Sequence, residues 1–329
     1  MSATPGPHPL GDAPALVHVT RGGVVESVHH ARLVVTGPDG RATIEHGAVA
    51  EPVLPRSCLK PVQALAMVRL GLDLPPHLLA LVCASHSAEP AHREGVAEIL
   101  ARAGLTPDDL GNAPELPLGE VERARWIAAG RDPEPIAQDC SGKHAGMLLT
   151  CHLRGWPTTG YLDPDHPLQQ AIRDTVAERC GPVTATTVDG CGAHLFAVPL
   201  IGVARAFGGL AAATDGPERT VADAMRAAPE MVGGEGRDVT AVMRALPGGI
   251  AKDGAESVYA AGTPDGTGIA LKVVDGAATP RARVALLVAA LRAGGHDTPG
   301  LAALADQPVL GGGRPVGAVT ALDLSEDHG

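Results

Sequence analysis

The chain has 329 residues, a formal net charge of −11 and an aromatic content of only 2%. It is long enough for one large domain or two average ones, and its core must be built from Val, Leu and Ala because aromatic residues are scarce. Lys and Arg form no long run, which argues against a nucleic-acid partner, and the longest fully apolar run, residues 284–291, is too short to span a bilayer.

The first predicted elements are β-strands. Residues 1–14 have the composition of a loose tail and lack the pattern of a signal peptide. Residues 15–50 contain short β-branched runs broken by "RGG" and "GPDG", and the second break is typical of a hairpin turn. Residues 254–275 repeat this pattern, with a Pro-Asp-Gly turn between two predicted strands.

The middle of the chain, roughly residues 57–245, is predicted to be mostly helical from its apolar periodicity and its Pro and Gly positions. A further apolar helix is predicted at 280–295 and would cover a sheet. Strands at both ends with helices between them favour one α+β domain over residues 15–329. Its sheet would come from about 15–55 and 247–329, and its helical region from about 56–246. Two domains split near residue 180 are less favoured because no linker is evident there.

Ser57 and Lys60, in "RSCLKPVQAL", stand where a helix is predicted to begin. Pro61 is tolerated only in a first helical turn, so the helix should start close to Ser57. Either Ser57 caps this helix and Lys60 is solvated, or the two share a face and a buried Lys60 activates the hydroxyl as a nucleophile. The Ser-x-x-Lys spacing alone favours the helix cap.

Two further stretches hold groups suited to catalysis. "LVCASHSAE" is an apolar run that ends in Ser85, His86 and Ser87, which offer hydroxyls and an imidazole or form a serine-rich loop that caps a helix. Lys252 stands directly before a strand predicted at 256–260, where the sheet edge would present it to a cleft. A surface lysine is the simpler interpretation of that position.

Six cysteines in a chain without a secretion signal favour a cytoplasmic protein whose thiols are free or partly bind a metal. Cys140 in "QDCSGKHAGML" and Cys191 in "VDGCGAHLFAVPL" each adjoin glycines and an apolar run. With His144 or His194 they would suit zinc, yet neither stretch has a C-x-x-C pair, so two buried unlinked thiols are favoured. A cysteine nucleophile with a histidine base also stays open.

Taken together, these motifs resemble the rhizobial-type L-asparaginases, the third structural class of asparaginase. The motifs that carry the resemblance, in the same order, are "RGGVVES", "RSCLKPVQAL", "CASHSAE", "CSGKHAGML", "HP" at 166–167, "VDGCGA", "MVGGEGR" and "AKDGAESVYAAG". The resemblance runs from about residue 18 to at least 275. It implies a fold like that of serine β-lactamases and glutaminases, with an antiparallel sheet flanked by helices.

The resemblance also implies two Ser–Lys tandems, Ser57 with Lys60 and Ser85 with Lys252. Ser57, activated by Lys60, would attack the side-chain amide of L-asparagine, and ammonia would leave. Water would then hydrolyse the acyl-enzyme to aspartate, while Lys252 holds Ser85 ready to shuttle protons. Backbone N–H groups would stabilise the oxyanion.

The remaining site positions, the cofactor and the oligomeric state are likewise implied by the resemblance. Zinc would be bound with partial occupancy, because a lysine ligand must first lose its proton. The substrate would be gripped by its α-amino group and by polar residues lining the same pocket, and the protein would be a homodimer. The implied positions are Cys140, Lys143 and Cys191 for zinc, and Asp189, Arg56 and His144 for the substrate.

The chain departs from the family at two positions. His194 follows "DGCGA" where relatives commonly have proline, so its imidazole would join the metal or alter the loop. Cys58 inside the Ser-x-x-Lys motif is also unexpected, and a thiol beside the nucleophile would be sensitive to oxidation. Two alternative functions remain: a related serine amidohydrolase or acyl-transferase, such as a glutaminase or a β-lactamase-like enzyme, and a non-catalytic amino-acid-binding module.

Overall fold

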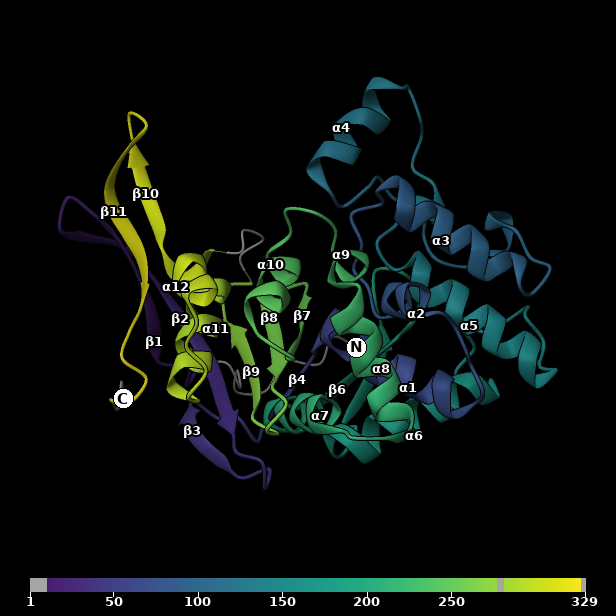
Figure 1. The fold of residues 1–329 in the computed structure, drawn as a ribbon, viewed down its shortest axis with the longest axis horizontal. Coiled ribbons are helices and arrows are strands. Elements are labelled where there is room, and N and C mark those ends of the chain that lie inside the picture. Colours follow the sequence, from purple (N-terminus) through teal and green to yellow (C-terminus); the bar gives the residue numbers. More distant parts are fainter. Residues whose placement is uncertain (1–10, 277–280, 327–329) are drawn as a thin grey trace, which may run out of the picture.

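Strands from both ends of the chain form one antiparallel sheet in the computed structural model, which describes residues 11–276 and 281–326 (Figure 1). The order along this sheet is β10-β11-β1-β2-β9-β8-β7, and β3 also pairs with β2. The strands are β1 (Ala15–Arg21), β2 (Val24–Thr36), β3 (Ala42–His46), β7 (Ile250–Gly254), β8 (Val258–Gly262), β9 (Gly268–Val273), β10 (Gln307–Gly311) and β11 (Arg314–Ala321).

Strand β2 joins the two halves of this sheet. Its first half pairs with β1 and is largely exposed, whereas its buried second half lies between β3 and β9. The β1-β11-β10 part therefore projects from the body of the molecule, and β9, β8 and β7 are buried within it (Figure 1). Strand β7 is the edge strand next to the helical part, so Lys252, which lies on β7, is at the boundary between the sheet and the helices.

Helices cover both faces of the buried strands. Helix α7 (Leu200–Ala212) packs closely on one face because glycines on the strands leave room for its backbone. An added Cβ at Gly268 would lie only 2.0 Å from the Ala204 carbonyl oxygen of α7. On the other face, α11 (Arg281–Ala293) places the Arg283 guanidinium over the Tyr259 ring of β8, 5.5 Å from its centroid.

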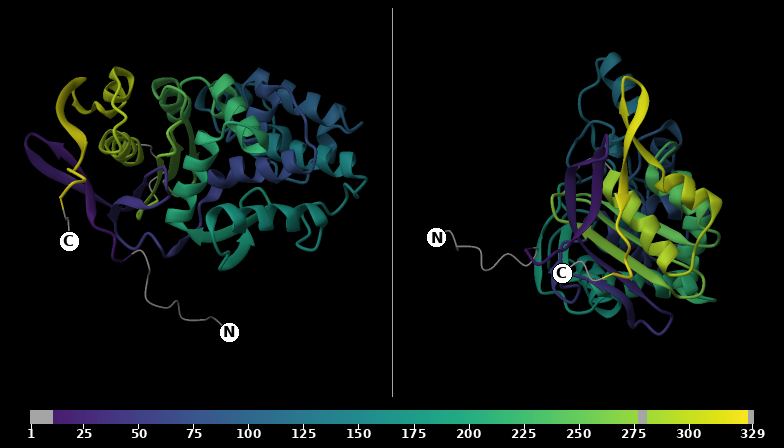
Figure 2. Two further views of the ribbon diagram at one scale, coloured as in Figure 1. Left: turned by 60° about the horizontal axis from the view of Figure 1, so that its bottom comes forward. Right: turned by 90° about the vertical axis from the view of Figure 1, so that its left-hand side faces the viewer.

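The region between the two halves of the sheet is mostly helical and lies to one side of it (Figure 2). It also holds a small sheet of order β4-β6-β5, formed by β4 (Pro52–Val53), β5 (Ala185–Val188) and β6 (His194–Pro199). The helices that contribute to the site or its walls are η1 (Arg56–Leu59), α1 (Lys60–Arg69), α2 (Pro76–Val82), α3 (Pro90–Ala101), α4 (Glu120–Ala128), α5 (Ser141–Arg154) and α10 (Asp238–Ala245). The others are η2 (Pro107–Asp109), η3 (Pro135–Ala137), α6 (Pro167–Cys180), α8 (Gly216–Ala227), α9 (Pro229–Val232) and α12 (Pro299–Ala305).

The α+β organisation predicted from the sequence is confirmed, with the strands within 15–50 and the hairpin of β8 and β9 in the expected places. Two details differ. The middle region contains a hairpin of β5 (Ala185–Val188) and β6 (His194–Pro199), paired across the "DGCG" turn. Lys252 lies inside β7 and not before a strand at 256–260, because 255–257 form a turn in which Glu256 has a positive φ.

Two predicted segments fall partly outside the described residues: most of the tail at 1–14 and the first residue of the helix at 280–295. Among the helices that are described, none has the length and apolar character needed to cross a membrane. The six cysteines are free and buried, in agreement with the expectation of free thiols.

Candidate active site

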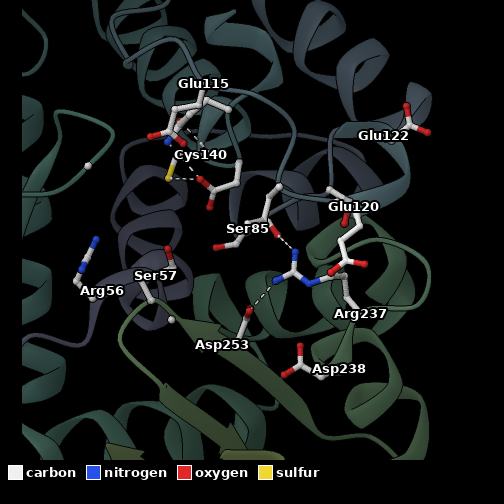
Figure 3. Close-up of a pocket in the computed structure, with 18 of the residues that line it drawn as sticks. Arg56, Ser57, Ser85, Glu115, Glu120, Glu122, Cys140, Arg237, Asp238 and Asp253 are labelled. Atoms are coloured by element: carbon white, nitrogen blue, oxygen red, sulfur yellow. Dashed lines mark hydrogen bonds and ion pairs between the residues drawn. The ribbon is translucent and has the colours of Figure 1, made fainter. Parts of the chain in front are cut away.

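Ser57 and Ser85 line the same cleft, which has a volume of about 1130 Å³ (Figure 3). Its wall is built from η1, the loop after α2, the segment before α5 and the end of β7. The cleft therefore brings together the serines of the two sequence motifs, although two helices, α1 and α2, separate them along the chain.

Ser57 sits in a strained helix start. Arg56, directly before it, has a left-handed backbone with φ 52°, a conformation that costs energy for a residue with a side chain. The Ser57 side chain caps neither η1 nor α1, so the predicted helix cap is wrong. As the second residue of η1, Ser57 has a backbone N–H for which the helix offers no carbonyl acceptor.

Lys60 is buried, with only 1% of its surface exposed, so the expectation of a solvated lysine is wrong. Its Nζ donates to the Ala84 carbonyl at 2.6 Å, to Ser85 Oγ at 3.0 Å and to Asp139 Oδ2 at 3.3 Å. Within the described chain, no hydrogen bond joins it to Ser57. The structure thus pairs Lys60 with the serine of the other tandem.

The charge of Lys60 is retained inside the protein. Burial disfavours the ammonium form, but Asp139 and the nearby sulfurs of Cys140 and Cys191 outweigh this and hold the pKa of Lys60 above its ordinary value. A charged Lys60 donates to Ser85 Oγ, which leaves the Ser85 proton free to point elsewhere.

Ser85 follows α2 in a tightly held loop, as the apolar run ending in polar residues predicted. Its N–H donates to the Val232 carbonyl at 3.0 Å. Next to it, His86 is fully buried, with Nε2 2.8 Å from Ser141 Oγ and Nδ1 accepting from the Ala88 N–H. Burial holds the pKa of His86 well below its ordinary value, so this imidazole is neutral and fixes the loop.

Lys252 is fully buried on β7 and contacts the residue that follows it. Its Nζ donates to the Asp253 carbonyl at 2.7 Å and to Asp253 Oδ1 at 2.6 Å. Burial lowers the pKa of Lys252, and the charge of Lys60 adds to this shift while Asp253 opposes it. In the described residues Lys252 has no hydrogen bond to Ser85, so the second tandem is not joined directly.

Three charged residues of this site were not predicted as such: Asp139, Arg237 and Asp253. Arg237 donates to Asp253 Oδ2 at 2.8 Å and to the Ser85 carbonyl at 3.3 Å, and so links the second serine to the end of β7 (Figure 3). They lie in the motifs "QDCSGKH", "MVGGEGR" and "AKDGAES". A charged residue in a glycine-rich loop is usually exposed to solvent, so the sequence does not distinguish these three from surface charges.

Gly254 allows β7 to approach the helix that carries Ser57. A Cβ at this position would lie 2.8 Å from the Pro55 carbonyl oxygen and 3.3 Å from Cys58 Sγ. Cys58 itself is buried, and its thiol contacts the Lys252 carbonyl at 3.1 Å. Burial raises the pKa of Cys58 to about 12, which argues against the expected sensitivity to oxidation.

Arg56 and Asp189 form an ion pair at one side of the cleft. Arg56 donates from two nitrogens to Asp189 Oδ1, at 2.8 Å from Nε and 2.7 Å from the terminal nitrogen. Both residues line the cleft, as the resemblance implied. His144 does not line it: the ring is fully buried behind the wall and its Nδ1 lies 2.7 Å from the Tyr161 hydroxyl.

The three residues expected to bind zinc lie together. Lys143 Nζ donates to Cys191 Sγ at 3.3 Å. A hydrogen bond from the Cys140 thiol, together with the charge of Lys143, holds the pKa of Cys191 far below its ordinary value despite burial. His144 also lowers the pKa of Cys191, and its buried Nε2 makes no hydrogen bond of normal geometry within the described residues. His194, in contrast, packs its ring edge-on against Phe196.

The fold and the site define an α+β protein with a buried pair, Ser85 and Lys60, at a cleft that Ser57 also lines. The sequence matches the family model described as L-asparaginase II over residues 17–321, and the chain belongs to that family. Membership implies asparaginase activity, an amidohydrolysis with asparagine as the substrate. A comparison with curated proteins finds no match.

The close approach at Gly254 generates a prediction. In Gly254→Ala the new methyl group pushes β7 away from η1, so kcat/KM for L-asparagine should fall about a hundredfold, as expected for a misplacement of about 1 Å. Gly37→Ala is the matched control, because Gly37 lies outside the cleft and a Cβ there would meet only ordinary contacts, at 3.5 Å and 3.6 Å. Ammonia release and circular dichroism measure activity and folding, and a folded Gly254→Ala protein with wild-type activity would contradict this account.

Proposed function

We propose that the protein is an L-asparaginase that converts L-asparagine to L-aspartate and ammonia through an acyl-enzyme on Ser57. One observation carries this proposal: a buried, charged Lys60 is hydrogen-bonded to Ser85 at the floor of the cleft that Ser57 also lines. The family supplies the substrate, and a serine hydroxyl beside a buried amine, in the cleft that the second serine also lines, supports the nucleophilic mechanism.

The zwitterionic end of asparagine fits the ion pair at the side of the cleft. Asp189 would accept hydrogen bonds from the α-ammonium group, and Arg56 would donate to the α-carboxylate. Because the two side chains are already fixed against each other, they recognise both charges with little further ordering. An asparagine held in this way would have its β-amide next to the serines.

In the first step Ser57 Oγ forms a bond to the amide carbon and the carbon–nitrogen bond breaks. The unpaired N–H of Ser57, with that of Ala255 at the end of β7, would donate to the oxyanion. Ser85, whose Oγ accepts from charged Lys60, would pass its proton to the departing nitrogen so that ammonia leaves. Water then adds to the ester and gives a proton to Ser85, while the base returns its proton to Ser57 as the carbon–oxygen bond to Ser57 breaks and aspartate is released.

The proton of Ser57 needs a base, and we assign it to Lys252. Its lowered pKa makes a neutral amine more accessible than at Lys60. Strand β7, which carries Lys252, is held against η1 through the contact between Cys58 and the Lys252 carbonyl. This assignment exchanges the partners implied by the sequence motifs: Lys60 serves Ser85 and Lys252 serves Ser57.

We also propose that Cys140, Lys143 and Cys191 hold a zinc ion. Two sulfurs and an amine are donors that zinc accepts, and all three side chains are buried together. Among the described residues no group of three or more His, Cys, Asp and Glu side chains could hold a metal, so the proposed site would use Lys143 as its third ligand. Zinc would supply positive charge and tie the "DGCG" turn to α5.

Substitution of Ser57 or of Lys60 tests the mechanism. Ser57→Ala and Lys60→Met should each lower kcat for L-asparagine by at least about a thousandfold, because the nucleophile or the group that polarises Ser85 is lost. Ser87→Ala is the control, since its hydroxyl donates to the Gly233 carbonyl at 2.9 Å and takes no part in the reaction. Near-normal ammonia release by folded Ser57→Ala protein would refute the assignment.

The pH profile tests the base. Lys252 accepts a proton only when neutral, so kcat/KM should rise as the pH increases through a pKa below the ordinary lysine value of 10.5. The groups that face Lys252, and therefore set this value, are Asp253, Lys60 and Cys58. A rise centred at or above 10.5, or a rate that falls over this range, would show that another group is the base.

The zinc site has a test that does not depend on activity. Cys140→Ser removes one sulfur ligand, so the zinc content of the dialysed protein, measured by atomic absorption, should fall well below that of wild type. Cys180→Ser is the matched control because Cys180 is also a buried, free thiol and ends α6, outside the predicted ligand set. Equal zinc in both variants would exclude this site.

A further inference from the structure

The chain has only four lysines, and all four are buried. Lys60, Lys143 and Lys252 belong to the site described above. The fourth, Lys272 on β9, is only 8% exposed, does not line the cleft and has no part in the mechanism. A buried ammonium group is costly unless its hydrogen bonds are satisfied, so its partner indicates what Lys272 does.

The ammonium group of Lys272 is bound to the main chain. Its Nζ donates to the Glu256 carbonyl oxygen, and in the described chain no hydrogen bond joins it to a carboxylate. Burial lowers the pKa of Lys272, while the charges of Glu256 and Asp275 oppose this shift and that of Arg56 adds to it. Two carboxylates are therefore near, yet the hydrogen bond goes to the backbone of the turn between β7 and β8.

This turn, residues 255–257, is strained. Glu256 has φ 59° and Ser257 has φ 53°, which are left-handed values unfavourable for residues with a side chain. In the described chain only two other non-glycine residues, Arg56 and Ala88, have a positive φ, and both adjoin serines of the cleft wall. Strain of this kind persists only where the surrounding structure fixes it.

Two cations fix the turn, one on each side of Ala255. Arg283 donates to the Gly254 carbonyl at 3.3 Å, and Lys272 holds the Glu256 carbonyl. Because the C=O and N–H of a trans peptide point in opposite directions, the first bond turns the Ala255 N–H away from Arg283. Ala255 lines the cleft, and its N–H has no acceptor among the described residues.

We propose that Lys272 is a positioning residue of the reaction: it holds the turn 255–257 so that the Ala255 N–H stays free to donate to the oxyanion that forms when Ser57 attacks. This inference rests on the proposed asparaginase function and adds to it a residue outside the cleft. The hydrogen bond of Lys272 is present before substrate binds, so the donor needs no reorganisation during the reaction.

Lys272→Met tests this role, because it removes the ammonium group and keeps an apolar stem. An oxyanion donor contributes about 100–1,000-fold to kcat, and here it is displaced and not deleted, so kcat for L-asparagine should fall by at least about tenfold. KM should change by less than about twofold, because Arg56 and Asp189, which would hold the charged end of the substrate, are untouched.

Arg32→Met is the matched control. Arg32 lies on β2 directly opposite Lys272 in the sheet register, is fully buried, and its guanidinium has no hydrogen-bond partner. The control removes a buried cation from the same region without touching the turn, and it should keep the wild-type kcat and KM. Circular dichroism checks folding. If Lys272→Met does not fold, Lys272→Gln replaces it, since glutamine keeps a polar end but lacks the charge and one atom of reach.

Hydrogen exchange measures the turn itself. The Val273 N–H donates to the Ser257 carbonyl at 3.1 Å, so its exchange rate, measured by NMR, reports on opening of the turn. This rate should be at least about tenfold faster in Lys272→Met than in the wild type and in Arg32→Met, because the turn has lost one of its two cations.

The outcomes separate this inference from the proposed function. If the wild type hydrolyses L-asparagine but folded Lys272→Met keeps its kcat, or loses only KM, or exchanges Val273 at the wild-type rate, the inference is wrong and the asparaginase assignment stands. If the wild type does not hydrolyse L-asparagine, that assignment fails. Hydrogen exchange then decides the inference: faster exchange in Lys272→Met supports it, and an unchanged rate overturns it.

Discussion

The structure depends on the buried ammonium group of Lys60, whose three N–H groups must all find hydrogen-bond acceptors. A buried charge without partners is very unfavourable, so three acceptors must converge on this amine: Ala84, Ser85 and Asp139. They come from the loop after α2 and the segment before α5, while Lys60 itself begins α1. The requirement therefore fixes three segments of the helical part around one point, and that point is the floor of the cleft.

A second buried charge organises the sheet side in the same way. Asp253, at the end of β7, is bound by Lys252, Arg237 and Arg283, which come from its own strand, from the residue before α10 and from α11. Together these cations hold its pKa far below the ordinary value despite burial. Ser85 contacts both centres, through Lys60 at its hydroxyl and Arg237 at its carbonyl. The inner floor of the cleft therefore suits a developing oxyanion.

The sequence predicts the elements well and the contacts poorly. Turn residues and β-branched runs specify the strands at both ends, and Pro61 marks the start of α1. The Ser-x-x-Lys spacing, however, favours a helix cap, and the resemblance implies a local pair, whereas Lys60 reaches Ser85 and Asp139, which are 25 and 79 residues further along the chain. These bonds follow from how the helices pack and from the strained backbone at Arg56, and residue spacing carries no information on either. His144 shows the same limit: its motif is next to the site, but its side chain points behind the wall.

The central claim is that Ser57 carries the acyl group while the Lys60–Ser85 pair delivers the proton. Intact-mass spectrometry after rapid quenching with a slowly hydrolysed asparagine analogue, followed by peptide mapping, tests it most directly. The account predicts one aspartyl ester per chain on the peptide that contains Ser57, and none on the peptide that contains Ser85. An ester on Ser85, or steady ammonia release with no covalent adduct on either serine, would contradict it.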